Sequence, residues 1–231
     1  MNAPARELSF TAPTPTQTSE SSPGAFTRDT LIKICGITKY EDAQFAIDAG
    51  ANALGFIFAE SRRCVSVAAA RDILRRLPQQ SHYVGVFMNQ SPDFIDDVVK
   101  QVPITHIQLH GNENIADFAQ LHKPIIKRIR VNPNDTARDL AQRIEAIEHA
   151  IPLVDPGCGD GERFDWSLLE SVRTHYLLAG GLNAENIASA ITIAKPMGVD
   201  VCTGVEALPG VKDHAKLAAF ISTIRSHDAR H

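Results

Sequence analysis

Short apolar runs recur eight times along the chain, and each is followed by a longer stretch with helical spacing. We expect strands at residues 31–34, 53–58, 83–87, 106–109, 125–129, 151–154, 176–179 and 199–201. The expected helices lie at 41–49, 67–77, from 91 onward, 115–121, 136–149, 166–171, 184–194 and 214–225. Strict alternation predicts an α/β protein with a parallel sheet, and eight units predict a closed (β/α)8 TIM barrel. An open, doubly wound sheet shares the alternation and is the second choice.

The first 29 residues differ from this pattern. They are rich in proline, serine, threonine and alanine, and no apolar period is visible there. We therefore expect a disordered tail over residues 1–29 and one catalytic barrel domain over residues 30–231. A transit peptide is the alternative for the tail, although its acidic residues disfavour that interpretation.

Charge and cysteine content narrow the class of protein. The net charge of −4 argues against a nucleic-acid partner, and no apolar run reaches the ~20 residues needed to span a membrane. Four cysteines without a CxxC pair, and no visible secretory signal, indicate reduced thiols and a cytoplasmic protein. A zinc site is disfavoured because ligand spacing is lacking among Cys35, Cys64, Cys158, Cys202 and His110.

In a barrel of this type the active site lies where the strands end, so the residues that follow each strand are the candidates. Two glycine-containing loops, Gly180-Gly181 and Thr203-Gly204, follow the seventh and eighth strands. Glycine lets backbone N–H groups approach an anion, and these loops often hold phosphate in barrels. We expect a phosphate site there, the alternative being glycines that only form turns.

Two further candidates end the first and sixth strands. A thiolate at Cys35 can take a proton from carbon, and a carboxylic acid at Asp155 can give one to oxygen. Lys33 shares a strand face with Cys35 and can help to lower its pKa. The alternatives are a small buried apolar residue for Cys35 and a cap of the following loop for Asp155. Arg63, or else Arg62, can pair with a carboxylate, unless it is a solvated loop residue.

Six motifs then follow one another over residues 31–226. They are Lys33-Ile34-Cys35-Gly36-Ile37-Thr38 with Glu41-Asp42-Ala43; Gly55-Phe56-Ile57-Phe58 with Ser61 and Arg63; Gln108-Leu109-His110-Gly111 with Glu113; Asp155 with Phe164-Asp165-Trp166; Ala179-Gly180-Gly181-Leu182 with Asn186; and Gly198-Val199-Asp200 with Gly204-Val205-Glu206 and Pro209-Gly210. In this order they resemble the motifs of the phosphoribosylanthranilate isomerases.

The resemblance implies an Amadori rearrangement of an aminoaldose to an aminoketose in tryptophan biosynthesis. It makes Asp155 the general acid and Cys35 the general base. The substrate-binding residues are then Lys33, Arg63 for the anthranilate carboxylate, His110, Asp200, and Gly180, Gly181, Thr203 and Gly204 for the phosphate. No metal or organic cofactor is expected, because the nitrogen of the substrate is the electron sink.

The chain departs from the family pattern in three places. Arg62 stands where proline is usual, and Cys202-Thr203 stands where two serines are common. Pro156-Gly157-Cys158 with Asp160 replaces a loop usually rich in glycine and threonine. Threonine still offers a hydroxyl to phosphate, whereas cysteine is a weak donor.

Three other functions are compatible with a phosphate-binding barrel. Indole-glycerol-phosphate synthases and ribulose-phosphate epimerases share the phosphate loops, but their catalytic lysine and glutamate residues, or metal ligands, do not stand out here. A non-catalytic phosphosugar-binding or thiol-sensing barrel has no need of Cys35 with Asp155. Broader specificity for a histidine-pathway aminoaldose needs a second phosphate site. The expected partner is a small phosphosugar, and both a monomer and a homodimer fit the sequence.

Overall fold

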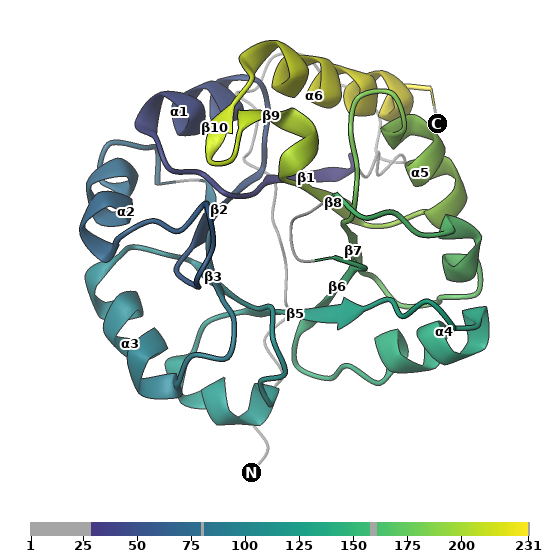
Figure 1. Ribbon diagram of the computed structural model, residues 1–231, viewed down its shortest axis with the longest axis horizontal. Coiled ribbons are helices and arrows are strands. Elements are labelled where there is room, and N and C mark those ends of the chain that lie inside the picture. Colours follow the sequence, from purple (N-terminus) through teal and green to yellow (C-terminus); the bar gives the residue numbers. More distant parts are fainter. Residues whose placement is uncertain (1–28, 80, 158–160, 231) are drawn as a thin grey trace, which may run out of the picture.

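The computed structural model describes residues 29–79, 81–157 and 161–230. Within them eight parallel strands close into a barrel in sequence order, with β1 hydrogen-bonded to β8 (Figure 1). The predicted (β/α)8 barrel is confirmed, and the open sheet is excluded. The strands are β1 Leu31–Ile34, β2 Ala53–Ile57, β3 His82–Phe87, β4 His106–Leu109, β5 Ile125–Arg130, β6 Ile151–Asp155, β7 Leu177–Leu178 and β8 Gly198–Val201.

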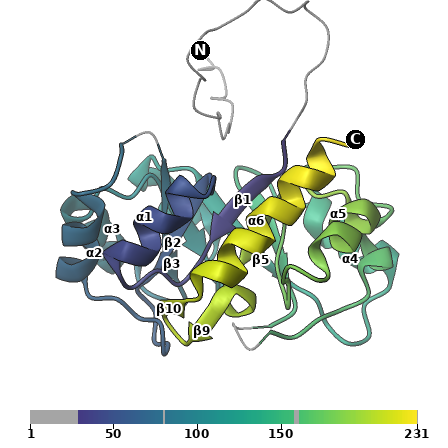
Figure 2. The same cartoon turned by 90° about the horizontal axis from the view of Figure 1, so that it is seen from above.

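In the described ranges six α-helices surround the barrel, arranged as Figures 1 and 2 show. They are α1 Tyr40–Asp48, α2 Val67–Leu74, α3 Pro92–Gln101, α4 Ala137–Glu145, α5 Ile187–Ala194 and α6 His214–Asp228. Their starts follow from local chemistry. The Ser91 hydroxyl accepts a hydrogen bond from the Phe94 N–H at 3.3 Å, as expected for a serine before the proline that begins a helix. Thr136 and Asp139 form a reciprocal capping box at the start of α4.

Two of the predicted helices are 3₁₀-helices instead, η1 Ile115–Leu121 and η2 Trp166–Leu169. Each buries a single side chain, Phe118 or Leu169, so neither has the apolar stripe that stabilises a longer α-helix. The first also ends at His122, which is left-handed with φ 49° and lies two residues before a proline.

The segment between β8 and α6 contains structure that the alternation did not predict. A short 3₁₀-helix, η3 Thr203–Val205, leads into an antiparallel hairpin of β9 Glu206–Leu208 and β10 Val211–Lys212. Gly210 takes a positive φ of 80° at its turn. Strands of two and three residues are too short to show an apolar period, which explains why the sequence pattern missed the hairpin.

Two apolar clusters hold the barrel together. The larger one joins the outer face of the strands to the helices and includes the fully buried Phe56, Phe87 and Phe220. The smaller one fills the barrel interior with residues such as Val84 and Leu153. Each such side chain contributes about 1.5–3 kcal/mol through burial. Packing on both faces keeps the strand ends rigid, so that the side chains after them keep fixed positions.

The two ends of the described barrel lie close together at the amino ends of the strands. The backbone N–H of Thr30 donates to Asp228 Oδ2 at 2.9 Å, and its hydroxyl donates to Oδ1 at 2.7 Å. Figure 2 shows this end opposite the β9–β10 hairpin. The proposed tail lies outside the described residues except for Asp29, so its boundary stays a prediction. No helix in the described part of the chain is long and apolar enough to cross a membrane.

Candidate active site

A cavity of about 310 Å³ opens at the carboxyl ends of the strands. Its volume lies at the small end of the range for small-molecule sites. Residues that follow β1, β2, β3, β4, β6, β7 and β8 line it, so the loops of nearly the whole barrel contribute. The sequence placed the site at this end, and the cavity lies there.

Cys35 is buried at the end of β1, where its N–H donates to the Val201 carbonyl of β8 at 2.8 Å. Gly55 on the neighbouring strand makes room for it, because a Cβ there would lie 2.8 Å from the Cys35 sulfur. A hydrogen bond from Cys202 is the main reason that the pKa of Cys35 is lowered to about 7. Burial opposes this effect, and the charge of Lys33 adds to it.

Cys202 directly follows β8 and is the neighbour of Cys35 in the barrel wall, since Ile34 and Val201 are partners in the β1–β8 register. Its pKa is raised well above the ordinary value, first by the hydrogen bond to Cys35 and then by burial. These effects favour the thiol form of Cys202 and the thiolate form of Cys35, and Cys202 Sγ also lies 3.7 Å from Glu206 Oε1. The local sequence pattern around Cys202 does not indicate this role, although closure of a barrel between its first and last strands brings the residues after them together.

Lys33 is 3% exposed and lies beneath the cavity without lining it. Its ammonium contacts Asp200 Oδ2 at 2.8 Å. Burial alone would lower its pKa, but the charges of Asp200 and Cys35 outweigh burial and raise it, so Lys33 stays charged. The predicted substrate contact of Lys33 stays a prediction. The position of its charge supports the other predicted role, an effect on the thiolate.

Asp155 ends β6 and lines the cavity together with His110 from the end of β4. Its Oδ1 accepts from the Gly157 N–H at 3.1 Å, and Oδ2 lies 3.6 Å from His110 Nε2. Burial, followed by the nearby charge of Arg128, lowers the pKa of His110 to about 3, so the ring is neutral at neutral pH. Asp155 therefore faces a neutral ring.

Two of the polar side chains that line the cavity carry an acceptor atom without a hydrogen bond from the described residues. Gln108 Oε1 and Asp200 Oδ1 are buried and accept no hydrogen bond from the described residues. Both side chains line the cavity. Buried acceptors need donors, and the hydroxyl groups of a sugar provide them. Gln108 was quoted in a motif but was not among the predicted site residues.

The glycine loops meet as expected. Gly180 and Gly181 have positive φ values of 96° and 59°, and their N–H groups donate no hydrogen bond within the described residues. Gly204 permits the close approach of the next loop, because a Cβ there would lie 1.9 Å from the Leu182 carbonyl oxygen. All three glycines and Thr203 line the cavity. Free N–H groups on a left-handed loop suit an anion.

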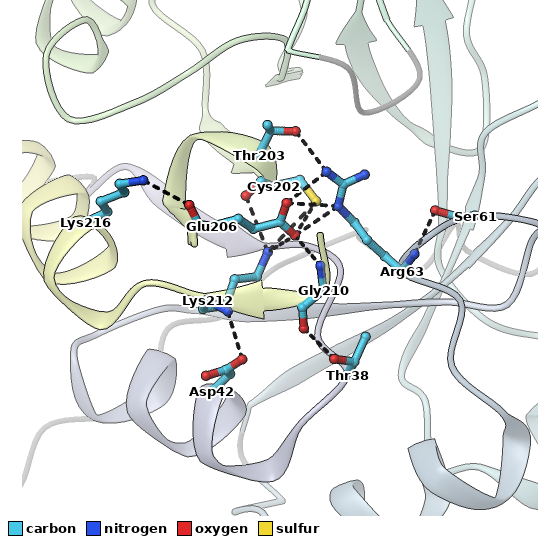
Figure 3. A network of polar contacts seen from close by, with 10 residues as sticks. All are labelled: Thr38, Asp42, Ser61, Arg63, Cys202, Thr203, Glu206, Gly210, Lys212 and Lys216. Carbon is cyan, nitrogen blue, oxygen red and sulfur yellow. Dashed lines mark hydrogen bonds and ion pairs between the residues drawn. The ribbon is translucent and has the colours of Figure 1, made fainter. Parts of the chain in front are cut away.

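Arg63 is buried beside the cavity, whereas Arg62 is exposed, and both line it. The guanidinium of Arg63 contacts Glu206 and Thr203 (Figure 3). The structure thus brings the predicted residues to one cavity, with the exception of Lys33 beneath it. Cys158 lies outside the described residues. In the described ranges no three His, Cys, Asp or Glu side chains group in a way that could hold a metal ion.

The fold and the cavity define an enzyme of the (β/α)8-barrel class, whose sites lie where the strands end. A family model described as N-(5'phosphoribosyl)anthranilate (PRA) isomerase matches residues 32–223. The chain belongs to this family, and the resemblance of the six motifs is confirmed. It is an isomerase of tryptophan biosynthesis.

Relatives and solved structures agree with this assignment. An N-(5'-phosphoribosyl)anthranilate isomerase of Pseudomonas fluorescens is 44% identical over 202 residues, which cover 84% of this chain and 97% of that protein. One of Legionella pneumophila is 39% identical over 201 residues, covering 84% and 96%. The structure of the isomerase from Thermotoga maritima has a TM-score of 0.77 and 38% identity, and the match covers 85% of this chain and 99% of that one.

Proposed function

We propose that Cys35 and Asp155 perform the acid–base steps of the isomerisation in this cavity. The observation that supports the proposal most strongly is their convergence. One ends β1 and the other ends β6, and they line one cavity with the glycine loops. In this mechanism the Asp155 carboxyl protonates the ring oxygen of the furanose. The C1–O bond breaks while the nitrogen lone pair forms a Schiff base at C1.

The Cys35 thiolate then removes the proton from C2 of the sugar. The electron pair of that C–H bond flows to the nitrogen and gives an enolamine, which tautomerises to the aminoketose. The chain supplies no electrons overall, because the reduction of C1 is balanced by the oxidation of C2 within the substrate. Cys202 and Lys33 favour the charged form of the base, which is the form that the step requires.

The proposed binding groups fit the two anionic ends of the substrate. Arg63 holds the anthranilate carboxylate, and Gly180, Gly181, Thr203 and Gly204 hold the phosphate. A solved phosphoribosyl anthranilate isomerase, 38% identical with a TM-score of 0.75, was crystallised with reduced 1-(o-carboxyphenylamino)-1-deoxyribulose 5-phosphate. That ligand carries both a carboxylate and a phosphate, which supports the proposal of two anion sites.

His110 and Asp200 contact the sugar between these two ends in the proposed arrangement. The open Oδ1 of Asp200 suits a hydroxyl donor. Lys33 is proposed to act on Cys35 by its charge. The reaction is proposed to need no metal or organic cofactor, since the substrate nitrogen provides the electron sink.

The free thiols Cys35, Cys64 and Cys202 support a reducing, cytoplasmic location. Monomers have been generated from the dimeric isomerase of Thermotoga maritima. We propose that the present protein acts as a monomer or a homodimer.

The direct test is a fluorescence assay of phosphoribosylanthranilate consumption by the full chain, after dialysis against a chelator. We expect turnover without added metal and the aminoketose as the product. Tight binding of a phosphosugar without turnover would favour the non-catalytic barrel instead. Comparable turnover of the histidine-pathway aminoaldose would establish the broader specificity.

The pH dependence of kcat/KM is a second expected result. Because the reactive form of Cys35 is the thiolate and its pKa lies near 7, kcat/KM should rise with pH up to about 7. Below that pH it should fall about tenfold per unit, since the base is protonated. Cys202→Ala removes the hydrogen bond to the thiolate, so this limb should move to higher pH.

The conservative Cys202→Ser variant keeps a donor and should retain the wild-type limb. An identical profile in wild type and Cys202→Ala would show that Cys202 does not act on the base.

A further inference from the structure

Glu206, the first residue of β9, is a buried carboxylate that sequence analysis did not assign. It is 7% exposed and does not line the cavity, so it is not placed to touch a ligand there. Its two oxygens accept from Arg63, with Oε1 at 2.9 Å from Nε and Oε2 at 2.8 Å from Nη2 (Figure 3). Burial would raise the pKa of Glu206, but Arg63 and Lys212 lower it, so the group is ionised.

This pairing uses one edge of the Arg63 guanidinium and leaves the other. A guanidinium has a side edge, Nε with one Nη, and an end edge formed by the two Nη atoms. Glu206 occupies the side edge of Arg63. Within the described residues Nη1 makes no hydrogen bond, and Nη2 also reaches Thr203 Oγ1 at 3.2 Å. Nη1 therefore stays available for a second carboxylate, and the geometry becomes bidentate when that carboxylate replaces Thr203 on Nη2.

Contacts from the rest of the β9–β10 hairpin fix the position of the Glu206 carboxylate. Lys212 Nζ, whose side chain is 0% exposed, contacts Glu206 Oε1 at 3.1 Å, and the Gly210 N–H donates to the same oxygen at 3.1 Å. The hairpin is itself fixed to the barrel, because the Lys212 N–H donates to Asp42 of α1 at 2.9 Å. Figure 3 shows these contacts as one connected network. Arg63 and Lys212 are cations and Glu206 is an anion, so the three together leave a net positive charge of about one beside the cavity.

We propose that Glu206 is a positioning residue, which with its hairpin directs the end edge of Arg63 toward the carboxylate of the substrate. The inference rests on the proposed role of Arg63. In this proposal the function of the β9–β10 hairpin is to support Arg63, which selects a carboxylated aromatic amine. Glu206 acts on the ligand through Arg63, so its removal should affect the carboxylate end of the ligand and not the phosphate end. Glu206 Oε1 also lies 3.7 Å from Cys202 Sγ, and Glu206→Gln keeps an oxygen that accepts from this thiol, so that contact is expected to persist in the variant.

Three effects of removing the Glu206 charge differ in sign or in the anion that they affect. Loss of orientation weakens binding of a carboxylate alone. A pure charge effect makes the cavity more positive and therefore tightens binding of every anion. General damage to the fold weakens the binding of carboxylate and phosphate alike. Binding of two small anions thus separates positioning from electrostatics and from a merely structural role.

The experiment measures binding of anthranilate and of inorganic phosphate by calorimetry, for wild type, Glu206→Gln, Arg63→Ala and the double variant. We expect Glu206→Gln to weaken anthranilate about tenfold and to leave phosphate unchanged. In the turnover assay it should raise KM by a similar factor with little change in kcat. The matched control is Asp228→Asn, which removes a carboxylate from the Arg225 ion pair at the far end of the barrel and should change neither affinity.

The double variant decides whether Glu206 acts through Arg63. If it does, Glu206→Gln has no further effect on anthranilate once Arg63 is alanine. Additive losses, tighter anthranilate binding, or equal weakening of both anions would each overturn the inference. If Arg63→Ala itself leaves anthranilate binding unchanged, the proposed role of Arg63 fails instead, and the two failures are thereby distinguished.

Discussion

Replacing Cys35 by serine is expected to lower kcat by about 10²–10⁴-fold, the usual contribution of a positioned acid or base. A serine hydroxyl keeps the size of the group, but it does not ionise near neutral pH. The pKa of about 7 that Cys202 and Lys33 give to the thiol is therefore lost with the sulfur. The measurement is kcat in the fluorescence assay, together with the melting temperature, which should change little.

Cys64→Ser is the matched control for this variant. Cys64 is an exposed free thiol that does not line the cavity, so the same chemical change there should leave kcat unaltered. A Cys35→Ser enzyme that keeps kcat within a few-fold of wild type would remove Cys35 from the mechanism.

Asp155→Asn is expected to have an effect of the same order on kcat, about 10²–10⁴-fold, because an amide cannot donate a proton to the ring oxygen. The amide keeps the shape of the carboxyl group, and its oxygen can still accept from the Gly157 N–H, so the fold should be retained. Asp165→Asn serves as the control. Asp165 caps η2 outside the cavity, and asparagine caps equally well.

A substrate deuterated at C2 separates the roles of the two residues. Loss of the acid makes ring opening limiting, so the isotope effect on kcat should disappear in Asp155→Asn. Loss of the base makes proton removal limiting, so the effect should increase in Cys35→Ser. The reverse pattern would exchange the proposed roles of Cys35 and Asp155.

The strands were predictable because each is a short apolar run, and the barrel followed from their number. The positions of Cys35 and Asp155 were predictable for the same reason, since the carboxyl ends of all strands meet at one face. The type of η1 and η2 was not predictable, because the type that so short a helix adopts depends on how much of it is buried.

The supporting contacts could not be derived from local patterns. Arg63 and Glu206 lie 143 residues apart, and Lys33 and Asp200 lie 167 apart. Only closure of the barrel through β1 and β8 brings such pairs together. The sequence could therefore suggest Lys33 as a substrate contact, but it could not show that the ammonium group of Lys33 forms an ion pair with Asp200.

The hydrogen bonds between Thr30 and Asp228 have a consequence for protein engineering. They place both ends of the described barrel opposite the β9–β10 hairpin (Figure 2), whereas the cavity opens at the carboxyl ends of the strands. A short linker between these ends would close the chain into a ring, which could then be reopened in a surface loop elsewhere to give a circular permutant. By the same geometry, a second enzyme fused before Thr30 would leave the mouth of the barrel open to substrate.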